Sequence, residues 1–360
     1  MKKIDKPLLF SVIALMIISL LMIYSASFIW AEYKFNNPFK YVINQGIFTI
    51  LGIIMLIIIS KINPKIYYKK SNTILFGCII LLILVLIPGI GVVRNGSRSW
   101  FQIGSFGIQP SEFTKIALII FTSKYLEKSN KFLKDYKKGV FPILFILFLL
   151  FGLIMLEPDF GTGMIIVITI ISLLFISGVN MKFFISLGIL GIIGIIGLII
   201  IAPYRMDRIT SFINPWSDPL GTGFQIIQSL YAIGPGGIFG VGYLNSRQKA
   251  FYLPEPQTDF IFSIIAEEFG IVGTLVILSL FSIILIRGVK IALKQENLFY
   301  KYLAFGLTFQ LMVQVIMNLS VVIGLIPVTG VTLPFMSYGG SSLLTSLIGI
   351  GIILSINNKT

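Results

Sequence analysis

Polar side chains that could carry chemistry gather in four segments of the chain, each marked by glycine or proline. They are Arg94 and Arg98 with Glu112 and Lys115; Glu157 with Asp159; Arg247 and Lys249 with Asp259; and the stretch around Ser337. The 360-residue chain has no histidine and one cysteine, which excludes Ser-His-Asp and Cys-His catalysis and any disulfide framework. Acid–base chemistry must therefore come from carboxylates, lysine, arginine or tyrosine.

Glu112 and Lys115 form the best-defined pair. Pro110 suits the first turn of a helix, so Glu112 lies close to the positive end of the helix dipole. Lys115 follows three residues later on the same helical face, and the two side chains can pair. Two interpretations stay open. One is an ion pair whose only role is to neutralise the polar end of the helix in lipid. The other is a functional pair, because ionisable groups at membrane depth are by default candidates for function.

Three other carboxylates each have a structural and a functional interpretation. Asp159 follows a proline in a tight turn, where composition favours a cap on the next helix. Glu267 and Glu268 follow Asp259 into an apolar run, so they need partners or water there. They are either polar contacts between helices or residues of a site.

Arg247 and Lys249 precede Asp259 by a few residues in a segment rich in proline. Cations near carboxylates at a membrane surface suit an anionic phosphate group presented from lipid. A solvated loop is the alternative, and the spacing alone does not decide between the two.

The elements that must position these residues are membrane helices. Hydrophobic residues make up 56% of the chain and charged residues 12%, which excludes a soluble globular fold and disorder. We predict an all-α integral membrane protein, one polytopic domain over 1–360, with a large loop at about 204–259 between the seventh and eighth helices. Within that loop, 224–233 suits a short interfacial helix. The ten predicted spans are roughly 8–29, 43–60, 72–89, 111–126, 140–156, 160–178, 182–203, 260–286, 300–326 and 338–356.

Charge predicts the orientation. With the N-terminus inside, most of the 28 lysines and arginines fall in inner segments, whereas most of the 14 acids fall outside or at outer ends of spans. The positive-inside rule then places both termini in the cytoplasm and the 204–259 loop outside. The net charge of +14 is explained by topology and by attraction to anionic lipid, so no nucleic-acid partner is expected.

Eight polar or glycine-marked strings follow one another along the chain. They are NGSRSW at 95–100, QPSEFTK at 109–115, PDFGT at 158–162, NPW at 214–216, GFQIIQSL at 223–230, NSRQK at 245–249, LPEPQTDFIFSIIAEE at 253–268 and LIPVTGVTLPFMSYGGSS at 325–342. In this order they resemble the SEDS family of shape, elongation, division and sporulation proteins, and the last two strings are closer to its FtsW/SpoVE branch than to its RodA branch. Gln257 departs from the histidine of many relatives, which argues against an imidazole role there.

The resemblance implies a peptidoglycan glycosyltransferase that polymerises lipid II at the outer face of the bacterial cytoplasmic membrane. A class B penicillin-binding protein and other division or elongation proteins are the implied partners. Asp259 matches the family's catalytic aspartate, and Glu112 and Lys115 match its fourth-helix polar pair. The expected substrate-binding set is completed by Arg94, Arg98, Asp159, Arg247, Lys249 and Ser337.

The implied chemistry fits these residues. Without histidine, a carboxylate such as Asp259 is the natural base for a sugar hydroxyl. Direct attack on the anomeric carbon inverts its configuration and expels undecaprenyl pyrophosphate, whose charge a guanidinium, an ammonium or a divalent cation would stabilise. No cofactor is otherwise implied; Mg²⁺ or Mn²⁺ could serve, but no cluster in the sequence has the spacing of a closed metal site.

Other functions are compatible with parts of the sequence. A lipid II flippase would need a cavity open to both sides, and the short basic inner loops show no polar motif for it. A small-solute transporter is disfavoured because the glycine and proline breaks gather at one face and are not paired. A non-catalytic scaffold of the division machinery fits everything except the clustered outer carboxylates and cations.

Overall fold

The computed structural model of the chain describes residues 5–94, 96–104, 106–133, 135–201, 212–221 and 223–358. Each predicted span falls on a helix, and the predicted short helix at 224–233 is present. Residues 202–203 of the seventh span and 204–211 of the long loop lie outside the described residues. The helices are α1 (Lys6–Phe35), α2 (Lys40–Lys61), α3 (Lys65–Leu86), α4 (Pro110–Ser129), α5 (Tyr136–Gly139), α6 (Phe141–Leu156), α7 (Phe160–Ile176), α8 (Met181–Ile201), α10 (Phe224–Ile233), α11 (Ile261–Leu293), α12 (Leu298–Val322) and α13 (Gly340–Asn357).

Several helices begin where the sequence supplies a cap. Asp5 Oδ1 accepts a hydrogen bond from the backbone N–H of Leu8 (3.1 Å) at the start of α1. Asn297 Oδ1 accepts from the N–H of Tyr300 (3.2 Å) at the start of α12, and Pro110 opens α4. These residues meet the need of the first turn, whose N–H groups have no partner within the helix.

The long helices have the length and composition of membrane spans. Among the described residues, α1, α2, α3, α11, α12 and α13 are each long and apolar enough to cross a bilayer, and α6, α7 and the first part of α8 are shorter apolar helices. A helix satisfies its own backbone hydrogen bonds, which lipid cannot do. The chain is therefore a multi-pass helical membrane protein.

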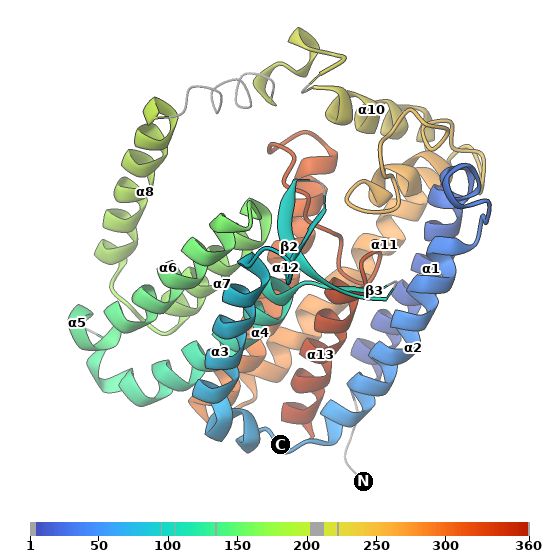
Figure 1. Cartoon of the computed structure of the whole chain (residues 1–360). Coiled ribbons are helices and arrows are strands. Elements are labelled where there is room, and N and C mark those ends of the chain that lie inside the picture. The colour runs from blue at the N-terminus through green and yellow to red at the C-terminus, as the bar shows by residue number, and fades with distance from the viewer. Residues whose placement is uncertain are drawn as a thin grey trace.

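The helices run back and forth between two ends of one bundle, with α8 at its edge (Figure 1). At one end, Arg287 Nε of α11 donates to Asp5 Oδ1 beside the start of α1 (3.0 Å). At the same end, Asn358 Nδ2, just after α13, donates to the carbonyl of Ser60 in α2 (3.4 Å). The α10 helix lies at the opposite end (Figure 1). At the centre, α12 packs against α4, α7, α11 and α13.

A small sheet connects α3 and α4, a feature that the sequence analysis did not predict. Its strands are β1 (Val92–Arg94), β2 (Ser97–Ile103) and β3 (Phe106–Ile108), paired antiparallel in the order β1-β2-β3. Arg94 lies opposite Ser97 in the register. In Figure 1 the sheet lies in front of the central helices, and it carries two of the predicted cations, Arg94 and Arg98, in the segment before α4.

The α11 helix is interrupted at Gly270, whose φ of 60° and ψ of −154° are not helical. The loop that follows α10 fills the break with backbone hydrogen bonds. Val241 N donates to the carbonyl of Glu267 (2.9 Å), and Ile271 N donates to the carbonyl of Gly237 (3.0 Å). A Cβ at Gly270 would lie 2.6 Å from loop backbone, so only glycine fits here.

Candidate active site

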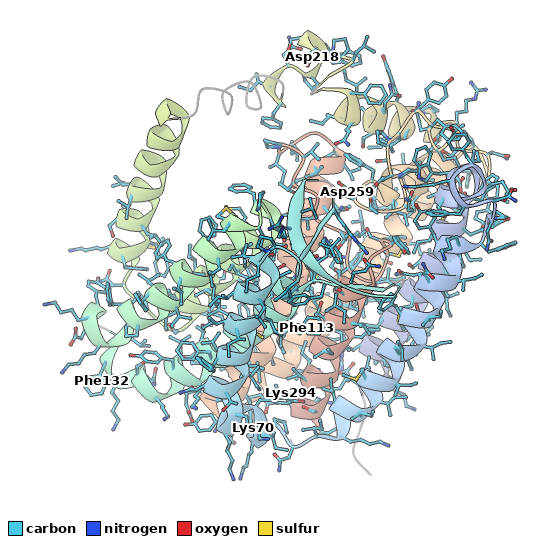
Figure 2. The ribbon with its side chains drawn as sticks, viewed as in Figure 1. Lys70, Phe113, Phe132, Asp218, Asp259 and Lys294 are labelled. Carbon is cyan, nitrogen blue, oxygen red and sulfur yellow. The ribbon has the colours of Figure 1, made fainter. Side chains whose placement is uncertain are left out.

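Asp259 lies at the end of the long loop, directly before α11. Figure 2 shows it at the same end of the bundle as Asp218, away from Lys70 and Lys294. The side chain is partly buried, and its Oδ1 accepts a hydrogen bond from Thr258 Oγ1 (2.7 Å). Burial raises the pKa of this carboxyl, and the Thr258 hydroxyl opposes the rise.

In the part of the chain that the structure describes, no lysine or arginine forms an ion pair with Asp259. A carboxylate without a cation beside it retains its basicity, and a raised pKa brings it closer to the operating pH of a general base. The arrangement at Asp259 therefore suits proton abstraction from a substrate hydroxyl.

Glu112 and Lys115 form the predicted pair at the start of α4. Lys115 Nζ donates to Glu112 Oε1 (2.9 Å), and both side chains are buried, with 2% and 7% of their surfaces exposed. Lys115 Nζ also donates to Gln314 Oε1 (3.0 Å), and Thr345 Oγ1 donates to Glu112 Oε2 (2.9 Å). The pair is thus joined to α12 and α13, and its role towards a substrate stays a prediction.

Asp159 caps α7, as its composition favoured. Its Oδ1 accepts from the N–H of Thr162 (3.1 Å), and its Oδ2 accepts from Gln109 Nε2 (2.8 Å) beside the start of α4. Burial raises the pKa of Asp159, while the hydrogen bonds from Thr162 oppose the rise. The cap is confirmed; substrate binding by Asp159 stays a prediction.

Glu157, two residues before Asp159, is also buried, but the surroundings of its carboxyl group differ from those of Asp159. Its side chain has no exposed surface, and among the described residues neither carboxyl oxygen has a hydrogen-bond partner. Burial, and then the charge of Asp159, raise the pKa of Glu157 to about 8. Glu157 is therefore mostly protonated at neutral pH.

The two arginines of the sheet differ in their surroundings. Arg94 is exposed; its Nη2 donates to Gln102 Oε1, and its guanidinium lies over the ring of Trp100, 5.1 Å from the centroid. Arg98 is half-buried and donates through Nη1 to the carbonyl of Leu86 (3.5 Å) at the end of α3. Arg94 is thus the better placed of the two to meet a ligand from outside.

Arg247 and Lys249 also differ in exposure. The Arg247 side chain is exposed. Lys249 is 3% exposed; its Nζ donates to Glu268 Oε1 (2.8 Å) and to Ser25 Oγ (3.1 Å), and lies 5.1 Å from the ring centroid of Phe28. This geometry favours a structural role for Lys249, and its predicted contact with substrate phosphate has no support from the structure.

Glu267 and Glu268 bind the loop to α11. Glu267 Oε1 accepts from the backbone N–H of Arg247 (2.8 Å) and its Oε2 accepts from Ser246 Oγ (2.5 Å). Glu268 Oε1 accepts from Ser25 Oγ of α1 (2.6 Å) as well as from Lys249. Of the two readings of these residues, the contacts favour polar links between helices and loop.

Ser337 is also held inside the fold. It is 4% exposed, and its Oγ accepts from the backbone N–H of Leu333 (2.8 Å). Its carbonyl accepts from Gln45 Nε2 of α2 (3.1 Å). Ser337 shapes the segment before α13, and substrate binding by its hydroxyl stays a prediction.

A polar row on α12, formed by Gln310, Gln314 and Asn318, was not predicted from the sequence. All three are buried. Asn318 Nδ2 donates to the carbonyls of Asp259 and Val331, both at 2.7 Å. The signal was present: three amides spaced by four residues share one helix face inside an apolar span.

No group of three or more Cys, Asp or Glu side chains that could hold a metal ion occurs among the described residues. Asp259 has a hydroxyl as its side-chain neighbour, while Glu112 and Glu268 are already paired with lysines. Participation of Mg²⁺ or Mn²⁺ in the reaction stays a prediction.

Comparison with known proteins places this geometry in context. Residues 6–360 match the family model FTSW_RODA_SPOVE, described as "Cell cycle protein". Stage V sporulation protein E of Bacillus subtilis (strain 168) is 49% identical over 358 residues, covering 99% of this chain and 98% of that protein. A Legionella pneumophila protein named "Probable peptidoglycan glycosyltransferase FtsW" is 40% identical over 358 residues, covering 99% of this chain and 91% of that protein.

Solved structures share the fold of this chain. One, described as "Structural coordination of polymerization and crosslinking by a peptidoglycan synthase complex", superposes with a TM-score of 0.83 at 29% identity, covering 99% of this chain and 98% of the other. The rod shape determining protein RodA of Thermus thermophilus superposes with a TM-score of 0.73 at 26% identity, covering 98% and 96%. The fold and the motifs thus lead to the same group of proteins.

Proposed function

The chain belongs to the FtsW/RodA/SpoVE family of cell cycle proteins, and we propose that it is a peptidoglycan glycosyltransferase that polymerises lipid II. The observation that carries the proposal is Asp259: a carboxyl with a raised pKa, one neutral hydroxyl as its side-chain partner and a backbone fixed by α12. Relatives over the whole length that are named as peptidoglycan glycosyltransferases support the substrate class.

In the proposed reaction, Asp259 accepts the proton of the acceptor sugar hydroxyl as that oxygen attacks the anomeric carbon of the donor. The new glycosidic C–O bond forms while the bond to the pyrophosphate oxygen breaks, and the electron pair leaves with undecaprenyl pyrophosphate. Attack from the opposite face inverts the anomeric carbon, so no covalent sugar–enzyme intermediate is needed.

The developing charge on the pyrophosphate requires cations that no carboxylate has already neutralised. Arg94 and Arg247 meet this condition: both are exposed, and neither forms an ion pair with an acid among the described residues. Arg98, on the neighbouring strand, is less exposed and contacts the end of α3. Lys115 and Lys249 each face a glutamate, so they are placed to set the shape of the site.

A class B penicillin-binding protein is the proposed partner. Support comes from the peptidoglycan synthase complex that superposes on this chain, whose description joins polymerisation to crosslinking. The transpeptidase acts on strands outside the cytoplasmic membrane, so both partners would work on the same face. We place the Asp259 end of the bundle outside and both termini inside, in agreement with the lysine and arginine distribution.

The deciding experiment gives labelled lipid II to the purified protein in detergent, with and without its partner, while a β-lactam blocks crosslinking. Glycan ladders made with this protein present, and absent with the partner alone, are the expected result. Ladders from the partner alone would support the scaffold alternative. Transport of lipid II across vesicles without any ladder would support the flippase.

Orientation has its own test. Single cysteines replace Lys131 and Asp218, both exposed, in a Cys78→Ser background. A reagent that does not cross the membrane should label the cysteine at 218 from outside and the one at 131 only after lysis. Labelling of both from outside would reject the topology and the extracytoplasmic site.

A further inference from the structure

We infer that Asn318 is a positioning residue that holds the backbone of Asp259 in place for the reaction; the inference rests on the proposed function. Asn318 lies on α12, with no exposed surface. Its amide nitrogen donates one hydrogen bond to the carbonyl of Asp259 and one to the carbonyl of Val331, both at 2.7 Å. Both amide protons are therefore used, and the two loops that they join come from opposite sides of α12 in the sequence.

The contact matters because little else fixes Asp259. Its carboxylate has one neutral side-chain partner, Thr258, which is its own neighbour in the chain. On the N-terminal side, Thr258 N donates to the carbonyl of Glu255 (3.0 Å) within the same loop, and the first anchor to another segment is the hydrogen bond from Tyr338 N to the carbonyl of Gln257 (2.8 Å). The position of the carboxylate therefore depends on backbone contacts, of which the one from Asn318 is made at Asp259 itself.

The same helix also fixes the second polar group of the site. One turn before Asn318, Gln314 Nε2 donates to the carbonyl of Thr332 (3.0 Å), next to Val331. Gln314 Oε1 accepts from Lys115 Nζ (3.0 Å). The backbone of Asp259 and the ammonium of Lys115 are thus tied to adjacent turns of one buried helix, which sets their separation.

Loss of the Asn318 amide would leave two buried carbonyls without that donor, and the segment before α11 would move or admit water. A displacement of about 1 Å can cost about 100-fold in rate. We expect Asn318→Ala to lower kcat for lipid II polymerisation by about 10- to 100-fold, with KM changed less than about threefold. Because a freed Asp259 meets more water, its pKa should fall and the acid limb of the pH–rate profile should move to lower pH.

Gln45→Ala is the matched control. Gln45 is also a buried amide, at 1% exposed, and its Nε2 donates to the carbonyl of Ser337 (3.1 Å) in the segment that contains Val331. Among the described residues, its side-chain hydrogen bonds go to Ser337 and Gly339 and not to Asp259. Its loss should lower the melting temperature in detergent, while kcat per folded protein and the acid limb stay close to wild type.

The experiment measures kcat, KM, the acid limb and the melting temperature for wild type, Asn318→Ala and Gln45→Ala in complex with the partner. A kcat loss with a shifted acid limb in Asn318→Ala alone supports the inference. A wild-type kcat and acid limb in Asn318→Ala, or equal kcat losses in both variants with the acid limb unmoved, overturns it. If Asn318→Ala does not fold, Asn318→Ser, which keeps one donor, carries the same measurement. A wild-type complex that makes no glycan refutes the proposed function instead.

Discussion

Asp259 and the pair Glu267 and Glu268 lie close together in the chain, but they differ in the number of hydrogen-bond donors around them. Glu267 and Glu268 accept hydrogen bonds from hydroxyls, backbone N–H groups and the ammonium of Lys249. Asp259 accepts one side-chain hydrogen bond, from Thr258, and is partly open. A carboxylate surrounded by donors is stabilised as an anion and holds structure together, whereas one with few donors is free to take a proton.

The same contrast separates the cations. Lys115 and Lys249 are buried against glutamates, while Arg94 and Arg247 are exposed. From the sequence, all four are candidates for binding a phosphate group. Their burial distinguishes the two lysines, which stabilise the fold, from the two arginines, which are accessible to a substrate. Substitutions on the two sides of this division should therefore have different effects.

The largest expected effect is at Asp259. Asp259→Asn keeps the shape and the backbone anchors but cannot accept a proton, and loss of a positioned base costs about 10²–10⁴-fold in rate. Polymerisation of lipid II by the purified complex is the measurement, with the melting temperature as a check on folding. Lipid II binding should persist, because the arginines are intact. Ladders that form at the wild-type rate would rule out Asp259 as the base.

Lys249→Met should act on stability. It leaves the Glu268 carboxylate buried without its cation, and breaking a buried pair from one side costs about 3–5 kcal/mol. Thermal unfolding in detergent measures the loss. Arg247→Ala is the control: its backbone N–H, which meets Glu267, survives the change, so stability should hold while lipid II affinity falls. A stable Lys249→Met protein with weakened lipid II binding would reverse the assignment of the two cations.

The Glu112–Lys115 pair shares a feature with each group: it is buried and paired, yet it belongs to the predicted substrate-binding set. Lys115→Met combined with Glu112→Leu leaves no unpaired buried charge, so a purely structural pair predicts recovery of the activity that either single change removes. We expect the double variant to stay at least about tenfold below wild type, because we expect at least one of the two side chains to line the substrate cavity. Near-wild-type ladders from the double variant would make the pair structural only.

At Glu157 the expected effect is a dependence of stability on pH. Its folded pKa is about 8 against an ordinary value of 4.5, so the folded state keeps a proton that the unfolded state releases. Stability should therefore fall as pH rises from about 4.5 to 8, by about 1.4 kcal/mol per pH unit from this group. Glu157→Gln should flatten this part of the melting curve against pH, while the exposed Glu296→Gln should not. An unchanged slope in Glu157→Gln would place the carboxylate in contact with water.

The helices could be predicted from sequence because the cause is local. A run of about 20 apolar residues needs lipid or a core wherever it occurs, so each predicted span falls on a helix. The ends differ more: α1 continues to Phe35 and α11 to Leu293, since polar residues extend a helix beyond the bilayer. The resemblance to the SEDS family, read from motifs, is confirmed by the family match and the structural neighbours.

The features that the sequence did not predict are set by distant contacts. The strands between α3 and α4 are short and pair only with one another, and no local pattern marks them in a chain dominated by apolar helices. The burial of Lys249 depends on Ser25 and Glu268, which come from α1 and α11. Asn318 gave a local signal, but its target, the carbonyl of Asp259, is known only once the fold brings them together.

The break in α11 has a consequence for the order in which the protein is made. The carbonyls of Glu267 and Glu268 receive their hydrogen bonds from Val241 and Gly242, not from the helix itself. Unpaired backbone groups in lipid cost several kcal/mol each, so α11 depends on the preceding loop for the hydrogen bonds at its break. The turns around Gly270 reach their final form only when residues 236–242 are docked against them. We therefore expect docking of this loop to precede the final form of the span.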